Sequence, residues 1–217
     1  MPERVSIFVD GFNLYYGMRS AGFRRFYWLN FRKLADNLLR SNQELVAVKY
    51  FTARISGTMP GATANVNARM QAKSQRQSVF LAAVDALDKV SILYGHYNTN
   101  KTAQCRQCNN QWATPEEKMT DVQIATHMIV DAFQDEFDTG IVISGDSDLV
   151  PPVRAIRQSL PQKKILAFFP PRKVSTHLRQ SCNAHSNLTR SHFARSQLDN
   201  PFTLQDGRVL HCPTEWS

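Results

Sequence analysis

Residues 5–14 read VSIFVDGFNL, a largely apolar run that leads directly into Asp10 and Gly11. A run of this length, followed at once by a turn-forming residue, predicts a buried β-strand over residues 5–9 that ends at Asp10. Similar runs recur along the chain, and we predict further strands at 45–51, 90–94, 141–144 and 165–169.

Segments with helical spacing of apolar residues separate the predicted strands. Strands that are apolar throughout and are joined by helices form parallel sheets covered on both faces. The sequence therefore predicts a three-layer α/β sandwich with a mostly parallel central sheet, of the Rossmann-like kind. In such sheets, ligands bind outside the carboxyl ends of the strands. The expected helices cover 31–39, 70–87, 120–133 and a segment through 153–156.

Local signals place two helix starts and one loop. Asn30 is placed to cap the first predicted helix. Thr120 and Gln123, three residues apart, predict a capping box at the start of the third. Residues 56–69 are rich in Gly, Pro and Asn, which predicts a surface loop before the second helix.

The composition is that of a basic protein with enough apolar residues for a core. Of the 217 residues, 42% are hydrophobic, which excludes wholesale disorder. No stretch reaches the ~18 apolar residues that a membrane helix requires, and the N-terminal run does not resemble a signal peptide. We therefore expect a cytoplasmic protein with no membrane partner, and the oligomeric state stays open. Lys and Arg number 26 against 18 Asp and Glu, and the net charge of +8 favours nucleic acid as a partner.

Four aspartates lie where a parallel sheet opens its ligand-binding edge. Asp10 ends the first predicted strand, Asp146 and Asp148 follow the strand at 141–144, and Asp121 lies in the first turn of a helix. Each also has a purely structural interpretation, as a turn residue, a helix cap or a partner of the helix dipole. Because three separate segments bring aspartates to the same predicted edge, a shared site is the better interpretation.

Clustered carboxylates carry an electrostatic cost, because like charges raise one another's pKa. Divalent cations remove that cost, and oxygen ligands of this kind select Mg²⁺ or Mn²⁺. Two such ions ~4 Å apart can activate a water and hold a scissile phosphate. The pattern therefore predicts a Mg²⁺ or Mn²⁺ site suited to phosphodiester chemistry.

Three ordered motifs carry a resemblance to a known family: residues 9–14 (VDGFNL), 117–122 (EKMTDV) and 143–151 (ISGDSDLVP). With these motifs, about residues 4–188 resemble the NYN domain, a branch of the PIN-like metal-dependent ribonucleases. The resemblance implies a PIN-like nuclease domain at 1–190 with a Cys-containing insertion at about 97–117. A C-terminal tail at 191–217 either packs on this domain or extends from it.

The resemblance also implies roles for individual residues. Asp10, Asp121 and Asp146 match the metal-binding positions, with Asp148 as the fourth ligand. Asn13 matches an asparagine that orients substrate or a metal-bound water. The implied reaction is hydrolysis of RNA by a metal-activated water, which leaves 5′-phosphate and 3′-hydroxyl ends.

Other residues are candidates for substrate contact. Ser144 opens the third motif and is expected to support the metal ligands, and Lys118 precedes Asp121 and is expected to contact phosphate. Single-stranded RNA is bound by cations on its backbone and by aromatic faces beneath its bases. The remaining candidates are basic residues beside aromatic ones or after the last strand: Arg24, Arg25, Arg172 and Lys173.

The predicted insertion carries Cys105 and Cys108, which have the spacing of half a zinc ribbon. A closed Zn²⁺ site needs four ligands, and this segment supplies two. The pair is therefore either part of a zinc site completed elsewhere or two free thiols.

Two other functions compete with the nuclease. A phosphatase of the haloacid dehalogenase type would use Asp10 as a covalent nucleophile, but it requires an aspartate two residues on, where this chain has Phe12. The second alternative is an RNA-binding adaptor that retains the fold without catalysis. The retained set of aspartates argues against the adaptor, and cleavage of RNA with Mn²⁺ against EDTA distinguishes the two.

Overall fold

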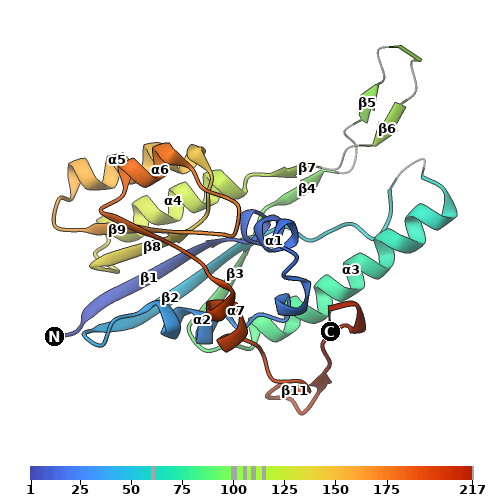
Figure 1. The fold of residues 1–217 in the computed structure, drawn as a ribbon, viewed down its shortest axis with the longest axis horizontal. Coiled ribbons are helices and arrows are strands. Elements are labelled where there is room, and N and C mark those ends of the chain that lie inside the picture. The colour runs from blue at the N-terminus through green and yellow to red at the C-terminus, as the bar shows by residue number, and fades with distance from the viewer. Residues whose placement is uncertain (60–61, 99–101, 105–106, 109–110, 114–115, 217) are drawn as a thin grey trace.

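A computed structural model of the 217-residue chain describes every residue except 60–61, 99–101, 105–106, 109–110, 114–115 and 217. A six-stranded sheet in the order β10-β9-β8-β1-β2-β3 forms its centre, and all of its pairings are parallel. Helices cover both sides of this sheet (Figure 1), which confirms the predicted three-layer α/β fold. The strands are β1 (Glu3–Asp10), β2 (Gln43–Thr52), β3 (Val90–Tyr94), β8 (Thr139–Ile143), β9 (Lys164–Phe169) and β10 (Ala184–Asn187).

The side chains of β1 contribute to two separate hydrophobic cores, because successive residues of a strand point to opposite faces. Val5, Ile7 and Val9 pack with α1, α2, α3 and α7 on one face. Phe8 packs with α4, α5 and α6 on the other. The helices are α1 (Gly11–Ser20), α2 (Phe31–Leu38), α3 (Ala64–Asp85), α4 (Thr120–Phe133), α5 (Val150–Ser159), α6 (Thr176–Ser181) and α7 (Arg190–Arg195).

The strand order reverses between β1 and β8. The chain builds β1, β2 and β3 outward on one side of this point, and then β8, β9 and β10 outward on the other. The segments that leave β1 and β8 turn to opposite faces, where α1 and α5 pack in different cores. In open parallel sheets such a switch point is where the ligand crevice forms.

The segment between β3 and α4 contains two short antiparallel strand pairs. β4 (His96–Asn98) pairs with β7 (Glu116–Lys118), and β5 (Thr102–Gln104) pairs with β6 (Gln111–Ala113). Figure 1 shows these strands leading away from the central sheet, with β5 and β6 farthest from it. In the described part of the chain, no helix combines the length and apolar character needed to cross a bilayer.

Two local expectations from the sequence are wrong. The predicted loop at 56–69 ends early, because α3 begins at Ala64 with the Thr63 hydroxyl as its N-cap. The predicted capping box at Thr120 is absent: Met119 occupies the N-cap position, and Thr120 is the buried first residue of α4. Met119 has a φ of 76°, so a tight left-handed turn directs the chain into α4 in place of a side-chain cap.

Two further elements form without a clear local signal. Residues 11–20 contain two glycines and only a weak apolar stripe, yet they form α1 directly after β1. The short strand β10 reads Ala-His-Ser-Asn and is exposed throughout. Its backbone pairing with β9, more than its side chains, defines it as an edge strand.

Residues 190–216 pack along the face that carries α1, α2 and α3. Phe193 of α7 is fully buried in that core. The Trp28 indole donates to the carbonyl oxygen of Asp199 at 3.1 Å. Arg76 of α3 forms an ion pair of 2.6 Å with Glu215. The C-terminal segment thus covers part of the core instead of extending into solvent.

We predict that Phe193→Ala destabilises the protein by about 3–4 kcal/mol, because a large buried ring is removed and a cavity remains. Phe133→Ala is the matched control, since Phe133 is 60% exposed, and its effect should stay within about 0.5 kcal/mol. Urea denaturation followed by circular dichroism measures both changes. Equal effects in the two variants would contradict a structural role for the C-terminal segment.

Candidate active site

The carboxyl ends of β1 and β8 lie side by side at the switch point of the sheet. Val9 pairs with Ile143, so the next residues along each strand, Asp10 and Ser144, meet at the same edge. Asp10 is 4% exposed although it carries a carboxylate. A charged group this deeply buried requires hydrogen-bond partners or a bound cation.

Two hydrogen bonds hold the Asp10 carboxylate. Its Oδ1 accepts from the backbone N–H of Asn13 at 2.9 Å, which makes Asp10 the N-cap of α1. Its Oδ2 accepts from the Ser144 hydroxyl at 2.8 Å. Both oxygens are therefore fixed in orientation by α1 on one side and by the end of β8 on the other.

The turn after β8 is joined to the same network. Asn13 Oδ1 accepts from the backbone N–H of Gly145 at 3.0 Å, and Ser144 Oγ accepts from the N–H of Asp146 at 3.0 Å. The Asp146 carboxylate in turn accepts from the N–H of Asp148 at 2.9 Å and caps the short helix η2 (Ser147–Leu149). The first and third sequence motifs thus form one hydrogen-bonded unit.

Close backbone approach explains two glycines at this edge. A Cβ at Gly145 would lie 2.4 Å from the carbonyl oxygen of Lys173, so the loop after β9 packs directly on the Asp146 turn. A Cβ at Gly95 would lie 2.5 Å from Thr120 Oγ1. Glycine at that position lets the start of α4, and with it Asp121, approach the end of β3.

The pKa values of Asp10 and Asp121 at this edge are both raised. Burial is the main reason that the pKa of Asp10 rises from 3.8 to about 6, and the charges of Asp121 and Asp146 add to it against the two hydrogen bonds. Partial burial also raises the pKa of Asp121, and the negative charges of Asp146 and Asp148 add to this. The structure thus brings Asp121 and Asp146 within electrostatic reach of Asp10, and Asp146 and Asp148 within reach of Asp121.

The donor set suits a hard divalent cation, although the carboxylates do not form a closed cage. Within the described ranges, no three His, Cys, Asp or Glu side chains stand close enough together to make one. Mg²⁺ keeps several waters and uses only one or two carboxylates, so it does not need such a cage. Mutual repulsion between oxygen ligands, with raised pKa values, is what a bound cation would relieve.

The predicted basic residues do not lie together. The exposed Lys118 ends β7, one residue before Met119. The loop of Arg172 and Lys173 lies beside the Asp146 turn through the packing of Lys173 on Gly145. On the other side of α1, Arg24 lines a cavity, whereas the Arg25 guanidinium lies 4.9 Å from the centre of the Phe26 ring.

The predicted zinc pair is only partly visible. Cys108 is exposed and carries a free thiol, and Cys105 lies outside the described residues. The structure therefore leaves the Zn²⁺ hypothesis as a prediction.

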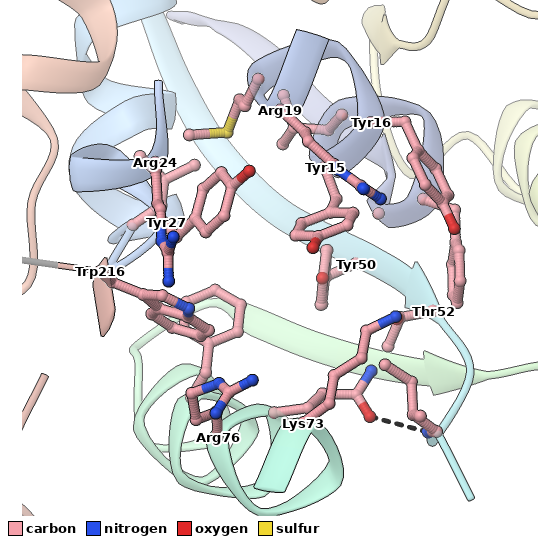
Figure 2. A pocket seen from close by; sticks show the side chains of 18 of the residues that line it. Tyr15, Tyr16, Arg19, Arg24, Tyr27, Tyr50, Thr52, Lys73, Arg76 and Trp216 are labelled. Atoms are coloured by element: carbon pink, nitrogen blue, oxygen red, sulfur yellow. Dashed lines mark hydrogen bonds between the residues drawn. The ribbon is translucent and has the colours of Figure 1, made fainter. Parts of the chain in front are cut away.

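A large cavity beside the acidic edge also contains residues that no sequence motif marks. It is lined on one side by Lys73 and Arg76 of α3 and by Trp216 near the C-terminus (Figure 2). Trp216 is far from Lys73 and Arg76 in the sequence, so they become neighbours only through the packing of the C-terminal segment.

The fold and the acidic edge define a PIN-like nuclease fold, whose members generally depend on divalent metals. The chain belongs to the NYN domain family, whose family model matches residues 4–189. The family predicted from the three motifs is thereby confirmed.

Two comparisons with individual proteins add to this. The chain is 24% identical over 180 residues to 6-hydroxy-3-succinoylpyridine 3-monooxygenase HspA of Pseudomonas putida (strain DSM 28022 / S16), over 72% of this chain and 56% of that protein. It thus spans little more than half of that relative's length. A protein of unknown function from Vibrio parahaemolyticus RIMD 2210633 has a crystal structure that matches with a TM-score of 0.51 and 20% identity, over 87% of this chain and 94% of that one. The second likeness supports the fold alone.

We predict that Asp10→Asn stabilises the metal-free protein at neutral pH. The raised pKa means that folded Asp10 holds its proton more tightly than the unfolded chain does. Its contribution to stability is therefore present at low pH and is lost as the pH rises through about 6. The rise from 3.8 to about 6 corresponds to a cost of about 3 kcal/mol at most.

Urea denaturation in EDTA, at about pH 4 and about pH 7.5, measures this effect. We expect the variant to exceed the wild type in stability at the higher pH, and the difference to shrink at the lower one. Added Mn²⁺ should narrow the gap by stabilising the wild type more. A variant that is less stable than the wild type at the higher pH in EDTA would show that Asp10 is not a strained carboxylate.

Proposed function

We propose that this protein is a metal-dependent endoribonuclease that hydrolyses phosphodiester bonds of single-stranded RNA. The observation that carries the proposal is the meeting of aspartates from three separate segments at the switch point of a parallel sheet, with a buried Asp10 among them. Membership of the NYN domain family supports it.

Asp10, Asp121 and Asp146 would hold Mg²⁺ or Mn²⁺, with Asp148 as a further ligand. A bound divalent ion supplies a water activated for attack on phosphorus and stabilises the charge that develops on the leaving oxygen. The geometry of the protein side supports this assignment, because both oxygens of Asp10 are oriented by donors that stay in place without substrate.

The neighbouring polar groups position the ligands. Ser144 donates to Asp10 and accepts from the N–H of Asp146, so it sets the relative placement of two ligands. The side-chain carbonyl oxygen of Asn13 already accepts a hydrogen bond from the N–H of Gly145. Its amide nitrogen is then the group that would donate to a phosphate oxygen or to a water at the site.

Basic residues on both sides of the acidic edge would bind the RNA backbone. Lys173 lies beside the Asp146 turn, and Arg24 lies beyond α1. We assign Lys118, Arg25 and Arg172 to the same footprint on their charge alone. The net charge of +8 supports a polyanionic partner.

Two other functions are alternatives to the nuclease. A non-catalytic RNA-binding adaptor would use the basic surface without the aspartates. The Pseudomonas putida relative is named as a monooxygenase of a hydroxylated pyridine, and an activity of that kind would use the aromatic cavity beside the edge. We favour the nuclease because the mutually coupled aspartates have no role in the adaptor.

Cleavage of a labelled single-stranded RNA with Mn²⁺, against the same reaction in EDTA, tests the proposal. We predict that Asp146→Asn and Asp121→Asn each lower the cleavage rate by about two orders of magnitude or more and leave RNA affinity within a few-fold, because they remove metal ligands. Asp85→Asn is the matched control, since Asp85 is exposed at the end of α3 and far from the motifs in sequence.

The outcomes separate the candidates. Binding without cleavage in the wild type would favour the adaptor. Cleavage that survives EDTA, or that survives in Asp146→Asn, would show that the metal assignment is wrong. A loss of cleavage in Asp85→Asn equal to that in Asp146→Asn would show that the effect is not specific to the acidic edge.

A further inference from the structure

Figure 2 shows a cavity of about 600 Å³ that is lined on one side by residues of α1. Gly11 and Phe12, which directly follow Asp10, contribute to its lining, and so do Tyr50 and Thr52 of β2. β2 pairs with β1, and Phe51 lies opposite Asp10 in the register. The cavity and the acidic edge are therefore neighbours at the carboxyl end of the same two strands.

Aromatic rings from separate elements line the cavity. The centres of the Tyr15 and Tyr27 rings are 5.1 Å apart, and Tyr27 meets Trp216 edge-on at 5.7 Å. Phe80 of α3 meets the same indole at 5.9 Å. Trp216 belongs to the short helix η3 (Thr214–Trp216), beyond the residues that match the family, so the C-terminal segment supplies one wall of the cavity.

Basic side chains enter the cavity from two opposite sides. Arg19 and Arg24 come from the side of α1, and Lys73 and Arg76 come from α3. Glu215 pairs with Arg76 at 2.6 Å. No carboxylate among the residues that the structure describes pairs with the other three cations.

Lys73 is one of these three cations, and its ammonium group points toward the middle of the cavity (Figure 2). Burial lowers the pKa of Lys73, and the positive charges of Arg19 and Arg76 lower it further. A bound anion would relieve this repulsion, because an opposite charge favours the charged form of the lysine.

We propose that this aromatic–basic pocket, lined by Tyr15, Tyr27, Trp216, Arg19 and Lys73, binds one unstacked nucleotide. Its base lies against the aromatic rings, and its phosphate is held by the cations. The size lies within the range of about 300–1,000 Å³ for ligand pockets. Aromatic faces and backbone cations together are the usual means of holding single-stranded nucleic acid.

This inference rests on the proposed function for one point, the position of the nucleotide in a bound RNA. There it would neighbour the scissile phosphate at the acidic edge. In an RNA strand each nucleotide is flanked by two phosphodiesters, each with one negative charge, and this matches several uncompensated cations better than the single charge of an aromatic carboxylate does. We therefore assign the pocket to a nucleotide and not to a small aromatic acid.

Calorimetric titration of the full chain in EDTA with adenosine 5′-monophosphate tests the pocket without cleavage. We expect Lys73→Gln to weaken binding about tenfold through the lost phosphate contact, and Trp216→Ala to weaken it about tenfold through the lost stacking surface. Arg69→Gln is the matched control, because Arg69 lies exposed on α3 outside the lining, and its affinity should stay within about twofold. Thermal unfolding of each variant verifies that it is folded.

Titrations with adenosine, inorganic phosphate and nicotinate identify which part of the ligand matters. We expect the nucleotide to bind about tenfold tighter than adenosine or phosphate alone. Equal affinity for inorganic phosphate, tighter binding of nicotinate than of the nucleotide, or equal losses in Lys73→Gln and Arg69→Gln would each overturn the proposal.

The two proposals fail independently. Asp146→Asn should bind adenosine 5′-monophosphate as the wild type does, because the pocket does not use that carboxylate. Nucleotide binding with the expected variant pattern, but no RNA cleavage by the wild type, would overturn the nuclease and leave the pocket. Cleavage without any nucleotide binding would overturn the pocket and leave the nuclease.

Discussion

The buried carboxylate of Asp10 is the constraint on which the arrangement of the site depends. It lies at the end of the central strand β1, is 4% exposed, and shares its field with Asp121 and Asp146. A carboxylate in such surroundings would be avoided in a structure selected for stability alone, because burial and like charges both disfavour its ionised form. Its two hydrogen bonds offset only part of this cost, since its pKa remains raised to about 6. Strain of this kind is characteristic of sites that bind a charged ligand.

The helix α1 connects the buried Asp10 to the aromatic–basic pocket. Asp10 is the N-cap of this helix, and its first turn places Asn13 against the Gly145 turn of the acidic edge. Further along, Tyr15 and Arg19 line the aromatic–basic pocket. One helix therefore connects a cluster of negative charge with a cavity of positive charge. An RNA strand would place a phosphodiester at the acidic edge and the neighbouring nucleotide in the aromatic–basic pocket, so the two sites together would hold it.

Much of this architecture could be predicted from the sequence because local patterns of residues specify it. The runs at 90–94 and 120–133 become β3 and α4 with those bounds, and Asn30 caps α2 as its residue type suggests. Other features were not accessible. The turn before α4 uses a left-handed Met119 where a capping box at Thr120 was expected, and Thr120 is instead buried in close contact with Gly95, a tertiary contact that no local pattern reveals. The strand β10 depends on pairing with β9 and has no apolar pattern of its own.

By itself, the sequence determined the class of fold and the family and predicted four candidate aspartates, because apolar periodicity and short ordered motifs can be recognised without the structure. Only the tertiary structure decided how those aspartates share an electrostatic field, since their coupling depends on the strand order at the switch point between β1 and β8. The aromatic–basic pocket was likewise decided in three dimensions. Trp216 lies far along the chain from Tyr27, and its ring contact with Tyr27 exists only because the C-terminal segment packs back across α3. Proximity between distant residues is a property of packing, and no local pattern encodes it.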